Sequence, residues 1–176
     1  MTKATDTTTS LDIAILTVSD TRSARDDTSG DYLAAAAEAA GHRIGARQIV
    51  IDDIYRIRAV LSQWIAEPAI QAVVVTGGTG FSGRDSTPEA VSVLFDKHIE
   101  GFGELFRAIS YEEIGTSTLQ SRALAGLANN TVIFCLPGST GACRTGWEKI
   151  IREQLDAAHR PCNFVGVLQT RARGEH

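Results

Sequence analysis

The sequence predicts an α/β fold, a three-layer α/β/α sandwich built on a mostly parallel sheet. Short apolar runs of strand length alternate with segments of helical periodicity along the first half of the 176-residue chain. The apolar runs are nearly unbroken, which is typical of strands that helices cover on both faces. Hydrophobic residues make up 43% of the chain and charged residues 22%, a balance typical of a globular protein.

The first strand and helix are expected within the first quarter of the chain. The apolar run IAILTVS, residues 13–19, predicts the strand. A polar loop follows and closes on Ser29, a residue type that often caps helices. The segment DYLAAAAEAAGH, residues 31–42, has apolar residues at helical spacing and nears its end at a glycine, a common helix stop.

Two more strands enclose the clearest helix of the sequence. The segment RIGARQIVI, residues 43–51, predicts a strand that ends at Asp52. Apolar residues then recur at i, i+3, i+4, i+7 and i+8 between residues 57 and 65, which predicts an amphipathic helix. The segment IQAVVVT, residues 70–76, predicts a third strand that leads directly into a glycine-rich loop.

The second half of the chain has weaker patterns. Thr87 and Pro88 resemble a helix cap followed by proline in the first turn, and an apolar helical face is expected to continue from there to His98. Shorter helical stretches are expected at residues 102–109 and 118–127. A fourth strand and a last strong helix are expected at residues 131–136 and 142–155.

We find no internal repeat or linker, so the simplest division of the chain has one domain. Residues 1–10 are expected to form a disordered extension, residues 11–170 a single domain, and residues 171–176 a polar tail. Ligands of open parallel sheets bind at the carboxyl ends of the strands. The loops to examine for function are therefore those at residues 20–29, 52–53, 77–87 and 137–141.

Composition excludes several classes of function. The formal net charge of −4 and pI of about 5.5 disfavour a nucleic-acid-binding protein, which would carry a basic patch. No apolar run approaches the roughly 20 residues that cross a bilayer, and the N-terminus is polar, so we expect a cytoplasmic protein. The three cysteines form no C-x-x-C pair, which disfavours a disulfide scaffold or a zinc site. Cys143 has no evident histidine partner and is interpreted as a structural thiol.

Residues 78–83 of the glycine-rich loop fit the dinucleotide pattern G-x-G-x-x-G, but their context does not. The next helix is expected to begin only near Pro88, too late for its N-terminus to meet a pyrophosphate. No acidic residue ends a second strand about 20 positions later, and the loop follows the third strand rather than the first. A phosphate-binding loop of the G-x-x-x-x-G-K-[ST] type is also absent from the sequence.

The composition of this loop still suits an anion. Its glycines permit positive φ and close approach of the backbone, so successive N–H groups could form a nest for phosphate oxygens. Thr76, Thr79 and Ser82 add hydroxyls, and Arg84 adds a cation. A carboxylate follows at Asp85, which favours a bridging cation such as Mg²⁺. The alternative is a structural turn in which Asp85 and Thr87 only cap the next helix.

The segment TGGTGFSGRDSTPEA resembles the signature of the MoaB/MogA family of molybdenum cofactor biosynthesis proteins. The segments LTVSD, DDTSG, GFGELFRAISYEEIGTSTLQSRALAG and LPGSTGACRTGWEKII look like the same family, and the third is most similar to the MoaB branch. The resemblance covers roughly residues 13–151.

The resemblance implies the MogA-like, molybdopterin-binding version of the α/β/α fold. It also implies binding of molybdopterin and its adenylylation by ATP and Mg²⁺ with release of pyrophosphate. A non-catalytic molybdopterin-binding protein of the same pathway is the alternative. The family forms trimers or hexamers built as dimers of trimers, and other proteins of the molybdenum cofactor pathway are further candidate partners.

The resemblance further assigns candidate roles to individual residues. Asp52 and Asp85 match carboxylates of catalytic family members and are the candidate catalytic and metal-binding residues. The candidate substrate- and nucleotide-binding residues are Thr76, Gly77, Gly78, Thr79, Gly80, Arg84, Glu104, Arg107, Ser110, Ser121, Arg122, Pro137, Gly138 and Ser139. Structural roles remain open for Asp52 as a helix cap, for Arg107 and Arg122 as ion-pair partners, and for Ser110 and Ser121 as caps.

Overall fold

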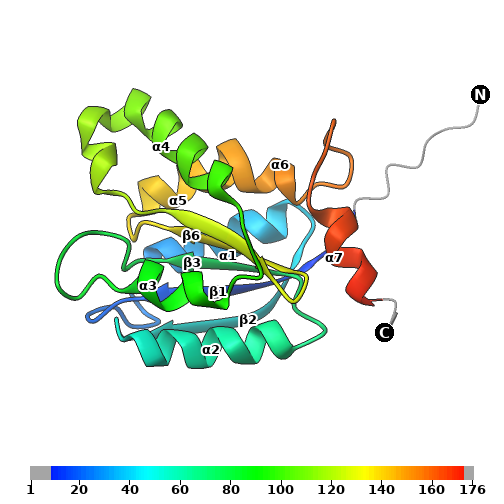
Figure 1. Cartoon of the computed structure of the whole chain (residues 1–176), viewed down its shortest axis with the longest axis horizontal. Helices are drawn as coiled ribbons and strands as arrows, with labels where there is room; N and C mark the ends of the chain where they lie inside the picture. The colour runs from blue at the N-terminus through cyan, green and yellow to red at the C-terminus, as the bar shows by residue number, and fades with distance from the viewer. Residues whose placement is uncertain (1–8, 173–176) are drawn as a thin grey trace, which may run out of the picture.

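A computed structural model of the chain describes residues 9–172, and it contains a six-stranded sheet with the strand order β2-β1-β3-β6-β5-β4 (Figure 1). The neighbours β2–β1, β1–β3 and β3–β6 are parallel, whereas β5 and β4 are added antiparallel at one edge. The strands are β1 (Asp12–Val18), β2 (Arg43–Val50), β3 (Ala72–Thr76), β4 (Lys97–His98), β5 (Leu124–Ala128) and β6 (Thr131–Leu136).

Helices cover both faces of the sheet (Figure 1). They are α1 (Thr28–Ala39), α2 (Ile54–Ala66), α3 (Thr87–Val91), α4 (Glu100–Ile114), α5 (Thr140–Gly146), α6 (Arg152–Gln154) and α7 (Val165–Ala172). Short 3₁₀ segments η1 (Ser92–Leu94) and η2 (Gly115–Gln120) follow α3 and α4, and a π-helical turn, η3 (Trp147–Ile151), joins α5 to α6. The fold confirms the predicted three-layer α/β/α sandwich with a mostly parallel sheet.

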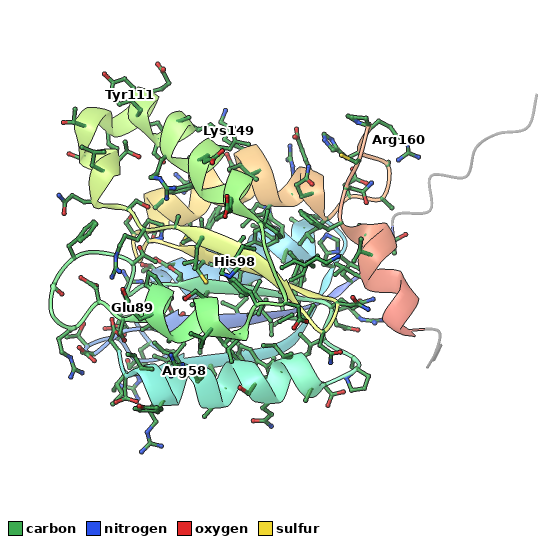
Figure 2. The ribbon with its side chains drawn as sticks, in the orientation of Figure 1. Arg58, Glu89, His98, Tyr111, Lys149 and Arg160 are labelled. Carbon is green, nitrogen blue, oxygen red and sulfur yellow. The ribbon has the colours of Figure 1, made fainter. Side chains whose placement is uncertain are left out.

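Two hydrophobic layers hold the three layers together. Successive side chains of a strand point to opposite faces, and β3 is buried along its whole length. Val74 therefore packs with Phe134 and Trp147 under α1, α4 and α5. Val73 and Val75 pack with the residues of α2 and α3 on the other face. Beside that second layer, Arg58 of α2 donates hydrogen bonds to the carbonyls of Glu89 and Ala90 in α3. Figure 2 labels Arg58 and Glu89 on these two neighbouring helices.

The edge of the sheet differs from the sequence prediction. Residues 118–127, expected as a helix, form the end of η2 and most of β5, and the helical face expected to reach His98 ends instead in strand β4. Asn129 and Asn130 both have positive φ, 48° and 59°, and close a tight β5–β6 hairpin. Pairing with β6 and β4 satisfies the backbone of β5, and this tertiary pairing overrides the local helical pattern.

Helix ends and lengths also differ in detail from the prediction. Asp27, rather than Ser29, caps α1 by accepting a hydrogen bond from the Gly30 amide. Ser86, rather than Thr87, precedes the first residue of α3. The helix expected at 102–109 extends over the whole of α4.

The predicted boundaries of the domain stay a prediction. Residues 1–8 of the expected extension and residues 173–176 of the expected tail lie outside the described residues, and residues 171–172 belong to α7. Within residues 9–172, no helix has the length and apolar character that a membrane span requires.

The parallel arrangement places four loops along the edge of the sheet that is formed by the carboxyl ends of its parallel strands. Strands β1, β2, β3 and β6 all run in the same direction, so the segments that follow them leave at the same end. In Figure 1 the loop between β3 and α3 extends beyond the strand ends at this edge. This edge combines the four loops that the sequence singled out.

The close contact between α5 and β6 gives a test of the packing. A Cβ atom added to Gly146 would lie 2.4 Å from Cδ2 of buried Leu136. We expect Gly146→Ala to lower the free energy of unfolding by about 1–3 kcal/mol in urea titrations, because overpacking a core displaces side chains. Gly141→Ala in the same helix, where nothing lies within 4 Å, is the control and should cost nothing. Equal stability of both variants would contradict this packing.

Candidate functional site

A hollow of about 710 Å³ lies at the carboxyl ends of β1, β3 and β6 and extends under α4 and η2. It brings together eleven of the residues that the sequence predicted: Thr76, Gly77, Gly78, Thr79, Gly80, Asp85, Ser110, Ser121, Pro137, Gly138 and Ser139. Residues separated by up to 63 positions in the sequence thus share one cavity, which supports a common binding role.

The glycine-rich loop leaves β3 through a turn that only glycine adopts easily. Gly77 and Gly78 have φ of 103° and 68°, and a Cβ on Gly77 would lie 2.1 Å from the carbonyl oxygen of Val18. The Gly77 amide donates to the Leu136 carbonyl at 2.9 Å, and Thr87 Oγ1 donates to the Gly77 carbonyl at 2.8 Å. These contacts fix the start of the loop between β1 and β6.

The next three amides of this loop have no internal partner. Within residues 9–172, the N–H groups of Gly78, Thr79 and Gly80 donate no hydrogen bond, and all three residues line the hollow. Backbone N–H groups that turn consecutively toward a cavity are suited to phosphate or carboxylate oxygens. An anionic ligand in the hollow would give these three amides acceptors.

Asp85 is the acidic residue at the end of this loop that faces the hollow. Its Oδ2 accepts a hydrogen bond from the Ser82 amide at 2.8 Å, and its own amide donates to the Ser82 carbonyl at 3.0 Å. A Cβ on Gly80 would lie 2.8 Å from the same Oδ2, so the absence of a side chain at Gly80 lets the carboxylate lie against the loop. The carboxylate is thereby held beside the free amides.

Arg122 acts as a clamp on this loop rather than as a lining residue. Its Nε donates to the Gly80 carbonyl at 2.9 Å and its Nη2 to the Asp85 carbonyl at 3.0 Å. The guanidinium also pairs with Glu89 and lies 5.1 Å from the centre of the Phe81 ring. Because these contacts occupy its donors, Arg122 holds the shape of the loop.

Arg84, predicted to bind nucleotide, does not line the hollow. It forms a bidentate salt bridge with Asp20 of the loop after β1, in which Nε and Nη2 donate to the two carboxylate oxygens at 2.9 and 2.8 Å. The Arg84 side chain is 65% exposed. Asp20 Oδ1 also accepts from the Asp52 amide at 3.0 Å. The guanidinium of Arg84 holds the pKa of Asp20 below its ordinary value, so this pair links two loops of the edge.

Asp52 lies behind the glycine-rich loop and is not among the residues lining the hollow. Its Oδ1 accepts hydrogen bonds from the amide and the hydroxyl of Ser86, and its Oδ2 lies next to Gly78. Burial raises the pKa of Asp52 above its ordinary value, the Ser86 bonds oppose this, and the negative charges of Asp85 and Asp20 add to it. The neighbouring Asp53, and not Asp52, caps α2.

The loop after β6 forms the opposite wall. Ser139 caps α5 by accepting from the Ala142 amide at 3.1 Å, and Thr76 Oγ1 donates to the Pro137 carbonyl at 2.9 Å.

Burial raises the pKa of the Cys143 thiol to about 11, so this thiol stays protonated at neutral pH, which fits its interpretation as a structural thiol rather than a nucleophile. Among the described residues, the buried Ser121 Oγ has no hydrogen-bond partner, and Ser121 lines the hollow.

Two predicted residues lie elsewhere. Glu104 and Arg107 line a smaller hollow of about 300 Å³ beside β4 and β5, where Arg107 Nη1 donates to the Ala123 carbonyl at 3.1 Å.

The structure also adds residues that the sequence analysis did not select. Ser19 and Arg22 come from the loop after β1, and Glu113 from α4. The loop had been marked by its place at the sheet edge, but nothing in its pattern indicated which side chains face inward.

No metal centre is preformed among the described residues. Residues 9–172 contain no cluster of three or more His, Cys, Asp or Glu side chains arranged to hold a metal ion. Mg²⁺ commonly binds through one or two carboxylates together with substrate phosphates. Asp85 beside free amides fits that kind of site, in which a nucleotide brings most of the ligands.

Sequence comparison finds similar proteins over most of the chain. Residues 14–157 match a family model described as a probable molybdopterin binding domain. The chain is 60% identical over 152 residues to molybdenum cofactor biosynthesis protein B of Escherichia coli K12, covering 86% of this chain and 89% of that protein. The protein of the same name from Bacillus cereus is 44% identical over 142 residues, covering 80% and 84%.

Solved structures agree with the sequence comparison. A crystal structure of a molybdenum cofactor biosynthesis protein B superposes with a TM-score of 0.84 at 38% identity, over 94% of this chain and 98% of that one. The tungsten cofactor synthesizing protein MoaB of Pyrococcus furiosus gives 0.75 at 38% identity, over 82% and 92%. A MogA structure gives 0.71 at 27% identity, over 82% and 99%.

The raised pKa of Asp52 predicts a pH-dependent cost to stability. The folded state holds the Asp52 proton more tightly than the unfolded state, whose pKa is near 3.8. That stabilisation is fully present below pH 3.8 and is lost as the pH rises through the folded-state pKa. An asparagine side chain does not titrate and can still accept from Ser86, so Asp52→Asn should melt at a higher temperature than the wild type at pH 7. The difference should shrink as the solution is acidified toward the unfolded-state pKa, and a difference that grows on acidification would refute the assignment.

The Arg122 clamp predicts a local change in dynamics. Arg122→Lys cannot reproduce the two guanidinium bonds to the Gly80 and Asp85 carbonyls, and each lost hydrogen bond is worth about 0.5–1.5 kcal/mol. We expect hydrogen exchange of the hydrogen-bonded loop amides, those of Ser82, Asp85 and Ser86, to become about tenfold faster, with β3 unchanged. Arg107→Lys, which loses a carbonyl contact outside the loop, should leave these amides unaffected. Unchanged exchange in Arg122→Lys would contradict the clamp.

Proposed function

Because the chain belongs to the MoaB/MogA family of molybdenum cofactor biosynthesis proteins, we propose that it binds molybdopterin and adenylylates it with ATP and Mg²⁺, releasing pyrophosphate. The observation that carries this proposal is the set of three free amides, at residues 78–80, beside the carboxylate of Asp85 in a hollow of ligand size. This arrangement offers hydrogen-bond donors for phosphate oxygens and an acid for the accompanying cation.

The residues of the site supply positioning and charge compensation, which is what phosphoryl-type transfer mainly requires. The terminal phosphate of molybdopterin attacks the α-phosphorus of ATP, a new P–O bond forms, and the bond to the bridging oxygen of pyrophosphate breaks. The amides of Gly78, Thr79 and Gly80 bind phosphate oxygens, and Asp85 holds the end of the nucleotide that carries the cation. Mg²⁺, when bound with ATP, neutralises phosphate charge.

Asp52 has a supporting place in this proposal. Its bonds to Ser86 fix the end of the glycine-rich loop, and its raised pKa follows from burial behind that loop. We infer that its negative charge orients the cation or the attacking phosphate from behind the loop. The opposite wall, with Ser110, Ser121 and the segment Pro137–Ser139, would then hold the pterin.

A non-catalytic molybdopterin-binding function is the second candidate. It is favoured by one observation: Asp85 lines the hollow, whereas Asp52 does not and already accepts two bonds from Ser86. A protein that only binds would show pterin affinity that is independent of ATP and Mg²⁺. Titration of the protein with MgATP in a calorimeter separates the two candidates, since a nucleotide site argues for transfer.

Self-association as a trimer or a dimer of trimers is proposed from the family. Exposed apolar side chains on α4 and η2, namely Leu105, Tyr111, Ile114 and Leu119, support an interface on this side of the molecule. Figure 2 shows Tyr111 on the outer part of α4, directed away from the body of the protein. Sedimentation equilibrium that gives a monomer would contradict this proposal.

The role of Asp85 gives the direct test of catalysis. In Asp85→Asn we expect formation of adenylylated molybdopterin to fall by about 10²–10³-fold, because several kcal/mol of charge compensation are lost. Molybdopterin binding should stay within about twofold of the wild-type value. Product is measured by chromatography with released pyrophosphate as the second readout.

Asp96→Asn is the matched control for this experiment. Asp96 also accepts a hydrogen bond from a backbone amide, that of Asn129 at 2.6 Å, but does not line the hollow. Its turnover should match the wild type. Full activity of Asp85→Asn, or no product from the wild type with all substrates present, would overturn the proposed transfer.

A further inference from the structure

Arg22 is a cation of the hollow to which neither the sequence patterns nor the comparisons assign a role. Among the described residues that line this hollow it is the only arginine or lysine. We propose that Arg22 binds a phosphate group of the substrate and thereby determines specificity for phosphorylated ligands. The inference rests on the proposed function, because it concerns the ligands of the same site.

The other two arginines of the site are already engaged. Arg84 makes its bidentate salt bridge with Asp20, outside the hollow. Arg122 is held by two loop carbonyls and by Glu89. The acidic residues of the lining are Asp85 and Glu113, so a bound phosphate would meet two carboxylates and one guanidinium. Arg22 is therefore the side chain that can compensate the charge of an anionic ligand directly.

The side chain of Arg22 is preorganised at both ends. Its backbone amide donates to Ser19 Oγ at 3.0 Å, and its Nη1 donates to Ser29 Oγ at 3.0 Å. Ser29 Oγ in turn donates to the Gly138 carbonyl at 2.7 Å, so Arg22 is tied to the loop after β6. A guanidinium has five N–H donors, and this network uses one of them. The others remain for a ligand, and the side chain is 29% exposed.

A buried acid keeps this guanidinium in place without neutralising it at short range. Asp27 is completely buried and accepts from Thr17 Oγ1, the Gly30 amide and Arg47 Nη2, at 2.9–3.0 Å. Arg22 Nη1 lies further away, 3.9 Å from Asp27 Oδ1. Arg47 is thus the close partner of Asp27, and the attraction to Asp27 orients Arg22 while its remaining donors stay free.

The location of Arg22 also suits a reaction between two ligands. Ser19 and Arg22 line a second hollow, formed by residues 19–24 and 47–51 along β2, as well as the main hollow. Adenylyl transfer requires that the phosphates of two substrates meet. A guanidinium on the boundary of two adjoining hollows can contact a phosphate from either side, and planar N–H pairs match phosphate geometry.

Binding measured without turnover tests this assignment. The wild type, Arg22→Gln and Arg22→Lys are titrated separately with MgATP and with molybdopterin by calorimetry. Arg25→Gln is the control, because Arg25 is exposed on the same loop and does not line the hollow. We expect Arg22→Gln to weaken at least one ligand by about 10–100-fold, Arg22→Lys to weaken it less, and Arg25→Gln to leave both unchanged.

The two ligands separate the possible sources of the phosphate. A loss confined to molybdopterin assigns Arg22 to the pterin phosphate, and a loss confined to MgATP assigns it to the nucleotide. Unchanged affinity of Arg22→Gln for both ligands, or a wild type that binds neither, would overturn the proposal. Melting temperatures identify a variant that is merely destabilised. If Arg22→Gln is destabilised, the ligand affinities of Arg22→Lys and Arg25→Gln are compared instead, and equal affinities of these two variants for both ligands would overturn the proposal. A wild type that binds both ligands but forms no product refutes only the proposed transfer.

Discussion

The close approach of backbones at Gly77 is the constraint on which the site depends. This residue donates its amide to the end of β6, its Cα leaves no room for a Cβ beneath the Val18 carbonyl of β1, and it adopts a φ of 103°. A Cβ on Gly138 would come within 3.3 Å of the Gly77 Cα, so three strand ends meet at this point. The next three residues of the turn line the hollow, and a side chain at position 77 would require displacement of β1.

Charged side chains of the site divide into those that shape the loops and those that remain for ligands. Arg122 and Arg84 each connect the glycine-rich loop to another segment, through carbonyls and Glu89 in one case and Asp20 in the other. Such fixed positions reduce the rearrangement that binding would require. The carboxylate of Asp85 and the guanidinium of Arg22 are left facing the cavity, with opposite charges that suit a metal-bound phosphate. The half-buried carboxylate of Asp52 behind the loop has a raised pKa, so its ionised form lowers stability at neutral pH.

The sequence predicted the parts of the fold that local patterns encode. Strands β1, β3 and β6 are nearly unbroken apolar runs, and the glycine-rich loop follows directly from β3. The short strands β4 and β5 were missed because the LAGLA segment has no alternation and β4 has only two residues, far from β5 in the sequence. Asn129 and Asn130 were an available signal for the hairpin that joins β5 to β6. For the site, backbone positions were predictable from strand ends. The partners of long side chains were not predictable. Arg84 and Arg122 bind other groups of the protein, and Arg22 lines the hollow from a loop that has no recognisable sequence pattern.

A crystal structure with a non-hydrolysable ATP analogue and Mn²⁺ would show whether the amides after β3 bind phosphate beside Asp85. We expect phosphate oxygens within hydrogen-bond distance of the Gly78, Thr79 and Gly80 amides, and an anomalous signal from the metal next to the Asp85 carboxylate. Nucleotide bound away from this loop, with the three amides facing only solvent and no metal near Asp85, would contradict it.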